Sequence, residues 1–260
     1  MITICKIRDL LNMMLRDPLF FLLYLRSYFM SISGLNGAFI ISNVRGLKLY
    51  HKPGDIFILK EIFYDMKYMK FKPQKGWIVM DIGAHIGSYT LLCAKNAGIV
   101  VAVEPEPQNL MVLKNNIKLN NFRNVIVMPV AISNSCFRTK LYRSNEKTDA
   151  HSIKLERRNI SKLTGNPIMV NCVNLDTLKG WLRLPKIDLL KIDAEGAEAE
   201  ILEGGKQTLK DVKYLIIEVH SETVNQKAIE NLLKDLDFKV VEVNKENPRY
   251  PIIFATKCFR

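Results

Sequence analysis

Cysteine and histidine are scarce in this sequence, and the few that occur form no recognisable set. The five cysteines stand singly, with no Cys-x-x-Cys pair, and there are 4 histidines in 260 residues. Structural zinc sites are commonly built on paired cysteines, so the absence of such pairs argues against one. Scattered single thiols also indicate a reducing compartment, or simply burial in a core.

Long hydrophobic runs are absent as well. The most apolar stretch, "PLFFLLYL" (18–25), ends at Arg26, far short of the roughly 20 residues that span a bilayer. It also lacks the small-residue cleavage site of a signal peptide. Residues 10–30 instead suit a helix that lies on a membrane surface, or one that packs on its own domain or on a partner. We therefore expect a cytoplasmic protein, with peripheral contact to the inner membrane surface as an alternative open to it.

Acidic residues are depleted in two parts of the chain. Residues 1–76 hold 12 Lys and Arg against 5 Asp and Glu, and residues 138–162 hold 8 against 3. These two segments account for the whole formal net charge of +12. Such a distribution suits an anionic partner, whether phosphate, nucleic acid or an acidic membrane surface, although solvated lysines alone would also produce it.

From residue 77 onward, short apolar runs alternate with helix-like segments, which predicts βαβ units and a mainly parallel sheet. Strands are expected over residues 77–83, 99–105, 124–132, 186–193, 212–220, 239–244 and 251–257, the last two as an antiparallel pair. Helices are expected over 87–96, 107–120, about 196–209 and 225–238. Residues 136–172 read as β segments around a polar, basic loop.

The turn after the first expected strand lacks a glycine that dinucleotide-binding proteins use. In "DIGAHIG" (81–87), Gly83 is followed by Ala84 and His85, so the second glycine of Gly-x-Gly-x-x-Gly is missing. The pattern Asp-x-Gly-x-x-x-Gly resembles motif I of the class I methyltransferases instead. That resemblance implies that Asp81, Gly83, Ala84 and Gly87 wrap the methionine part of S-adenosylmethionine, with His85 beside them.

The end of the second strand provides an independent test of this interpretation. Glu104, in "VAVEPEP", lies 17 residues beyond Gly87, where a carboxylate can accept hydrogen bonds from both ribose hydroxyls of the cofactor. Pro105 follows it, and Ala131 and Ile132, at the end of the third strand, are expected to border the adenine. NAD enzymes use a similar acid, so the glycine spacing separates the two ligands. No Tyr-x-x-x-Lys pair follows the fourth strand, as a short-chain dehydrogenase would require.

A second group of acids lies in "LLKIDAEGAEAEILEGG" (189–205). The apolar run leads into Asp193, then Glu195 and Gly196, where a helix is expected to begin. Ligand-facing groups of an open α/β sheet lie at such strand ends, and the positive end of a helix dipole keeps nearby carboxylates ionised. Simple N-capping is the structural alternative for Asp193.

The amino-acid sequence of these segments resembles that of the FkbM family of methyltransferases. The shared segments are "DIGAHIGSYT", "VEPEPQNL" with "VLKNNIKLN", "LLKIDAEGAE" and "IEVH" (217–220), and they cover roughly residues 55–220. Glu61 and Tyr68, in "EIFYDMKYM" (61–69), resemble the polar residues of the family segment that precedes the first strand. The resemblance implies S-adenosylmethionine as cofactor and O-methylation, often of sugar or polyketide-type hydroxyls.

Methyl transfer to a hydroxyl needs a nucleophile held near the methyl carbon and a group that removes its proton. The expected sheet edge offers Asp193, Glu195, Glu218 and His220. We predict that His220 or Asp193 is the general base and that Glu195 orients the acceptor or the methionine end; a purely structural role for His220 is an equal alternative. No spacing among these residues is diagnostic of a metal, and none is predicted.

The acceptor is expected to be a small anionic molecule, a sugar or glycan, or a lipid-linked saccharide. The basic loop over residues 138–162 can close over the site, and His151, Ser152 and Arg157 are candidate acceptor contacts within it, together with Tyr68. An RNA methyltransferase of the same fold is less favoured, because the fourth strand leads into Asp-Ala-Glu-Gly rather than an Asn-Pro-Pro-Tyr-like segment. A non-catalytic, cofactor-binding subunit is the remaining alternative.

The expected architecture is thus an α/β, Rossmann-like class I methyltransferase fold over residues 55–260. It has a seven-stranded, mostly parallel sheet in the order three-two-one-four-five-seven-six, with helices on both faces and the last strand antiparallel. Residues 1–54 are expected to form a helical and partly extended section that shapes the acceptor pocket, a partner interface or a membrane contact. The oligomeric state does not follow from the sequence.

Overall fold

The computed structural model describes residues 4–35, 37–143, 151–153 and 165–258. Its central sheet has seven strands in the order β5-β4-β3-β9-β10-β12-β11, and only β12 runs against the others. The strands are β3 (Ile78–Ile82), β4 (Ile99–Val103), β5 (Val125–Met128), β9 (Ile187–Ile192), β10 (Val212–Glu218), β11 (Phe238–Asn244) and β12 (Ile252–Lys257). The predicted strand order and the antiparallel last strand are confirmed.

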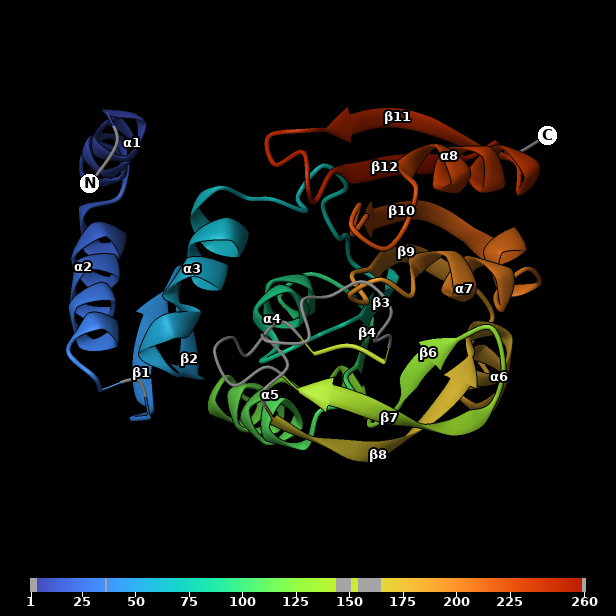
Figure 1. Cartoon of the computed structure of the whole chain (residues 1–260), viewed down its shortest axis with the longest axis horizontal. Coiled ribbons are helices and arrows are strands. Elements are labelled where there is room, and N and C mark those ends of the chain that lie inside the picture. The colour runs from blue at the N-terminus through green and yellow to red at the C-terminus, as the bar shows by residue number, and fades with distance from the viewer. Residues whose placement is uncertain (1–3, 36, 144–150, 154–164, 259–260) are drawn as a thin grey trace.

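Helices cover both faces of this sheet (Figure 1). Every residue of β3 and β9 is buried, as expected for parallel strands enclosed on two sides. One apolar cluster packs α6, α7 and α8 against one face, and a second packs α4 and α5 against the other. The helices are α4 (Ser88–Ala94), α5 (Pro107–Leu119), α6 (Leu175–Trp181), α7 (Glu198–Glu203) and α8 (Gln226–Asp235), with a 3-10 turn, η4 (Thr208–Asp211).

The third predicted strand, residues 124–132, is wrong as a single element. It divides into β5 and a short β6 (Ala131–Ser133), which leaves the main sheet and pairs with β8 (Gly165–Asn174). Pro129 lies between them and has no N–H to donate to a ladder, so the chain turns there. The resulting small sheet, β6-β8-β7 with β7 (Phe137–Arg143), confirms β structure in the polar segment.

The helix predicted over 196–209 is shorter than expected. α7 ends at Glu203, and Gly204 and Gly205 follow it before the 3-10 turn η4. Both glycines are crowded: a Cβ on Gly204 would lie 2.6 Å from the carbonyl oxygen of Ser133. Close packing on β6 and α6, which no local pattern reveals, therefore interrupts the helix.

The N-terminal section contains helices and a two-stranded sheet, and it is attached to the sheet domain. The side chains of Asn116, on α5, and of Asn120, the C-cap residue of α5, hydrogen-bond the backbone of β2 at Tyr50 and Lys48, with distances of 2.6–3.1 Å. Helices α1 and α2 lie away from the sheet in Figure 1, beyond β1, β2 and α3. The elements are α1 (Ile4–Arg16), α2 (Pro18–Ile32), β1 (Ile40–Val44), β2 (Leu47–His51), the 3-10 turn η1 (Pro53–Asp55), α3 (Ile56–Leu59) and a π-helical turn, η2 (Lys60–Tyr64).

Apolar residues of α1, α2, β1 and β2 belong to the same cluster as those of β3 and α4. Among the described residues, no helix is both long and apolar enough to cross a bilayer. The domain boundary at residues 54 and 55 stays a prediction.

Candidate active site

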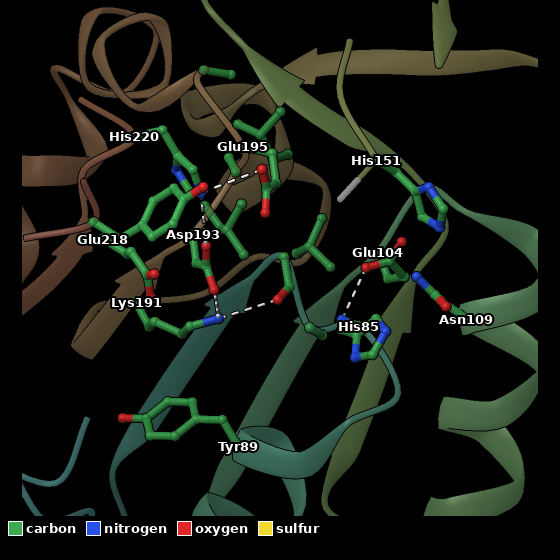
Figure 2. A pocket seen from close by; sticks show the side chains of 18 of the residues that line it. His85, Tyr89, Glu104, Asn109, His151, Lys191, Asp193, Glu195, Glu218 and His220 are labelled. Carbon is green, nitrogen blue, oxygen red and sulfur yellow. Dashed lines mark hydrogen bonds and ion pairs between the residues drawn. The ribbon is translucent and has the colours of Figure 1, made fainter. Parts of the chain in front are cut away.

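A cavity of about 940 Å³ opens at the carboxyl ends of β3, β4, β9 and β10. Parallel strands present their ligand-facing groups at this edge, next to the point where the strand order reverses. Figure 2 shows the two ends of the cavity. One end holds Asp193, Glu195, Glu218 and His220, and the other holds His85, Glu104, Asn109 and His151. The cavity is large enough for a nucleoside cofactor and an acceptor together.

The turn after β3 is built around a glycine that cannot be replaced without collision. Gly83 has φ +77°, and a Cβ on it would lie 1.8 Å from the carbonyl oxygen of Asp193. The backbone N–H groups of Gly83 and Ala84 both donate to the carbonyl of Val103 at 3.0 Å. Gly87, with φ +90°, is the N-cap residue of α4, and a Cβ there would meet Leu113. The turn therefore holds the carboxyl ends of β3, β4 and β9 in close contact at the base of the cavity.

Glu104 lies across this turn, with its carboxylate almost fully buried. One oxygen accepts from the backbone N–H of His85 and the other from that of Glu106, both at 2.9 Å. Burial raises its pKa above the ordinary value, although these two hydrogen bonds oppose the shift. Each carboxylate oxygen retains a second lone pair, so the group can still accept from two ribose hydroxyls.

Lys191 lies between the turn at Gly83 and the carboxylates of Asp81 and Asp193. Its ammonium lies 3.1 Å from Asp81 Oδ1 and 3.3 Å from Asp193 Oδ2, and it donates to the carbonyl of Gly83 at 3.1 Å. Burial alone would lower the lysine pKa, but the two carboxylates raise it above its ordinary value. Asp81 also accepts from Thr90 at 2.6 Å, is fully buried and does not line the cavity. It acts on the site through Lys191 rather than by the direct contact expected from the motif.

Asp193 faces the cavity between Lys191 and His220 (Figure 2). Burial would raise its pKa, but the positive charge of Lys191, aided by His220 and Lys67, lowers it, so the carboxylate is ionised at neutral pH. The single hydroxyl hydrogen of Tyr68 is shared between two acids: the hydroxyl bonds Glu218 Oε2 and lies 3.2 Å from Asp193 Oδ2. The candidate acceptor contact Tyr68 is therefore a buried partner of two acids that also lines the cavity.

Glu218 ends β10 and is held by two neighbours, Tyr68 and Lys67. The ammonium of Lys67 lies 3.0 Å from its Oε2. Burial and the charge of Asp193 raise the pKa of Glu218, while Lys67 opposes them. The arrangement favours a supporting role for Glu218, behind Asp193.

His220 is almost completely buried, and a second carboxylate fixes its orientation. Its Nδ1 lies 2.8 Å from the fully buried Glu198, and its Nε2 lies 3.3 Å from Glu195 and 4.0 Å from Asp193. Burial would lower the pKa of His220, but the bond to Glu198 raises it above the ordinary value. Asp193, Glu195 and His220 thus form one cluster, as the sequence suggested they would.

Most of the remaining predicted residues also surround the cavity. His85 has φ +53°, and neither ring nitrogen has a hydrogen-bond partner among the described residues. Ser152 does not line the cavity; its hydroxyl donates to the carbonyl of Glu195 at 2.8 Å and so positions that residue. Arg157 lies outside the described residues. Those that do line the cavity are Ala84, His85, Pro105, Ala131, Ile132 and His151.

Three important side chains were not predicted from the sequence. Lys191 lies in the fully buried strand β9, whose other residues apart from Asp188 are apolar, and a lysine next to the apolar pair Leu189 and Leu190 was a usable signal. Glu198 is the second acid of "EGAE", a segment in which the sequence analysis singled out only Glu195 as a candidate acid. Lys67 is recognised only through its contacts with Glu61 and Glu218, which are remote from each other in sequence.

The sheet order and the cavity together define a class I methyltransferase. The family model described as the methyltransferase FkbM domain matches residues 81–240, which is more than half of the chain. The chain belongs to this family, and its cofactor is S-adenosylmethionine. The resemblance noted in the motifs is confirmed, and the protein is a methyltransferase.

Named relatives share 25–28% of their aligned residues with this chain. The chain is 28% identical over 219 residues to methyltransferase sdnD of Sordaria araneosa, covering 73% of this chain and 84% of that one. It is 25% identical to the hexuronic acid methyltransferase AglP of Haloferax volcanii, over 65% of this chain and 67% of the other. It is 28% identical to the 2-O-methyltransferase NoeI of Sinorhizobium fredii, over 54% and 62%.

A solved structure agrees in fold. The FkbM methyltransferase of Methylobacillus flagellatus superposes with a TM-score of 0.52 at 15% identity, covering 75% of this chain. This chain spans about half of that protein, covering 47% of it.

Proposed function

We propose that the protein transfers the methyl group of S-adenosylmethionine to a hydroxyl of a sugar, a glycan or another anionic acceptor, free or lipid-linked. The observation that carries this proposal is the cluster of Asp193, Glu195 and His220, which faces the cavity beside the turn at Gly83. A hydroxyl needs a proton acceptor at the methyl carbon, and the cluster supplies three candidates.

In this mechanism the hydroxyl oxygen attacks the methyl carbon in line with the carbon–sulfur bond. The oxygen–carbon bond forms, the carbon–sulfur bond breaks, and the electron pair returns to sulfur as the neutral thioether of S-adenosylhomocysteine. The proton passes to Asp193 or His220, and Glu195 orients the acceptor. Glu104 holds the ribose at the other end of the cavity, which sets the position of the sulfonium.

The expected acceptor carries negative charge or many hydroxyls. Arg249 is exposed on the cavity wall, and a guanidinium matches carboxylate and phosphate geometry. Two of the relatives are a hexuronic acid methyltransferase and a 2-O-methyltransferase, which supports acceptors of this kind. The turn Asp193-Ala194-Glu195-Gly196 after β9 carries no aromatic residue on which a base could stack, which disfavours RNA as the acceptor.

We also propose that helices α1 and α2 lie against an anionic membrane. Leu15 and Leu19 are 76% and 80% exposed, and Arg16 and Arg26 are exposed on the same two helices. An apolar stripe flanked by arginines is typical of helices that lie in the interface of a bilayer. The remaining large apolar residues exposed on the two helices are Leu11, Met14, Leu22, Tyr28, Phe29 and Ile32.

The test is transfer of a tritiated methyl group from S-adenosylmethionine into extracts of the host. We expect label in the glycan or polar-lipid fraction with the wild-type protein and none with Asp193→Asn. Label confined to RNA would contradict the proposed acceptor, and no label in any fraction would contradict the activity.

A further inference from the structure

The cluster that faces the cavity has the composition of a metal site. One ligand atom each of Asp193, Glu195 and His220 can be chosen so that all three lie within 4.8 Å of one another. The two acids are 24% and 20% exposed, so they open to the cavity, while His220 is buried behind them. Spacing in the sequence gave no indication of a metal here, because His220 comes from a different strand.

The hydrogen bond between His220 and Glu198 determines what the other ring nitrogen presents. Glu198 is 0% exposed, and its Oε1 also accepts the backbone N–H of Gly196 at 2.9 Å. A carboxylate only accepts, so Nδ1 of His220 carries a hydrogen and a neutral ring has its lone pair on Nε2. That lone pair faces a carboxylate oxygen of Glu195 at 3.3 Å and one of Asp193 at 4.0 Å. Three acceptor atoms thus converge, and a positive charge between them would be stabilised.

The described residues next to the cluster include more carboxylates than ammonium groups. Lys191 lies between Asp81 and Asp193, and Lys67 lies between Glu61 and Glu218. A divalent cation held by Asp193, Glu195 and His220 would offset part of this negative charge.

The two carboxylate oxygens of Asp193 face different neighbours, which leaves room for an ion beside Oδ1. Lys191 lies against Oδ2 of Asp193, and His220 faces Oδ1. Ligands about 2.1 Å from an ion lie roughly 3 Å apart when adjacent and about 4.2 Å apart when opposite. The separations of 3.3 and 4.0 Å from Nε2 fall in that range. Glu198 would serve as the outer carboxylate that metal-bound histidines commonly have.

We propose that Asp193, Glu195 and His220 bind one divalent cation of the Mg²⁺ or Mn²⁺ class. Carboxylate oxygens with a single imidazole suit these hard or intermediate ions. The exposed side of the cluster leaves coordination positions toward the cavity. In a role that rests on the proposed function, the bound ion would lower the pKa of the acceptor hydroxyl. Asp193 and His220, as ligands of the ion, would then not take the proton, which would pass instead to water in the cavity.

The test uses Mn²⁺ alone, added to full-length protein freed of metal with a chelator. Free Mn²⁺, measured by electron paramagnetic resonance, should decrease by one equivalent per chain, and Mg²⁺ should compete. Glu195→Gln should weaken binding at least 10-fold. Glu222→Gln, which alters an exposed carboxylate on the same cavity wall, should not weaken it. Far-ultraviolet circular dichroism checks that each variant is folded.

Equal Mn²⁺ binding by wild type and Glu195→Gln, or none by either, would overturn the site. The outcome is separable from that of the proposed function, because methyl transfer that persists in the chelator without bound Mn²⁺ removes only the metal. Stoichiometric Mn²⁺ binding without transfer to any fraction would remove only the proposed acceptor chemistry.

Discussion

The backbone carbonyl of Asp193 lies directly against Gly83, at a position where a side chain would need to begin. A Cβ on Gly83 would come within 1.8 Å of that oxygen. The cofactor turn and the candidate catalytic strand end are therefore in backbone contact, and neither can shift without the other.

Gly83→Ala should destabilise the protein by more than about 2 kcal/mol, because it adds a collision to a φ of +77°. Urea unfolding would measure the loss. Gly54→Ala is the matched control, since a Cβ there meets nothing within 4 Å and φ is not positive. Equal stability of the two variants would show that the contact at Gly83 is not as close as described.

Asp193→Asn should lower turnover at least 100-fold while the affinity for S-adenosylmethionine changes only a few-fold. The amide keeps the shape of the side chain but loses the charge that faces His220 and Lys191, and acid–base groups typically contribute 10²–10⁴-fold. Single-turnover methyl transfer and calorimetry measure the two quantities separately. Asp235→Asn, on the exposed face of α8, is the control, and full turnover in Asp193→Asn would remove this residue from the chemistry.

Binding of S-adenosylmethionine should weaken as the pH falls through the pKa of Glu104, which burial raises above 4.5. Protonation replaces an acceptor with a donor and removes a hydrogen bond to the ribose. Glu104→Gln should bind weakly and show no such pH dependence. A wild-type affinity that is flat down to the acid limit of folding would contradict the assignment of Glu104 to the ribose.

The carboxyl group of Glu104 also makes the free energy of unfolding depend on pH. The folded pKa of Glu104 lies above the unfolded one, so the folded state binds its proton more tightly. The contribution of Glu104 to the free energy of unfolding therefore falls as the pH rises from about 4.5 through the raised value. Glu104→Gln should remove this part of the pH dependence of unfolding in the absence of cofactor.

Replacing Leu15 and Leu19 together with glutamate should abolish binding to vesicles rich in phosphatidylglycerol. The change removes two of the most exposed apolar side chains and opposes the charge of Arg16 and Arg26. Co-sedimentation measures the bound fraction. A control with Met169→Glu and Val241→Glu alters two exposed apolar residues elsewhere and should bind normally. If the wild-type chain stays in the supernatant, the membrane proposal is wrong.

Much of the sheet domain was predictable because its signals are local. Buried apolar runs such as β3 and β9, the acid at each strand end and the glycine spacing all lie within a few residues of one another. The division of residues 124–132 at Pro129 was also open to prediction, since proline interrupts a ladder. The prediction of one continuous strand over 124–132 was nevertheless wrong, because the apolar pattern continues across the proline.

Contacts between remote segments could not be predicted in the same way. The bond between His220 and Glu198, the pairing of Lys191 with Asp81, and the contact of Tyr68 with Glu218 join residues from different elements. Nothing in the sequence near His220 identifies which of several acids would fix its ring. The cluster is visible only once the fold brings the ends of β9 and β10 together.

The most direct measurement is calorimetric titration of the purified protein with S-adenosylmethionine and, separately, with NAD⁺. We predict one S-adenosylmethionine bound per chain, no heat from NAD⁺, and at least about 10-fold weaker binding in Glu104→Ala, because two charged hydrogen bonds to the ribose are lost. Binding of NAD⁺ in place of S-adenosylmethionine, or an unchanged affinity in Glu104→Ala, would contradict the account.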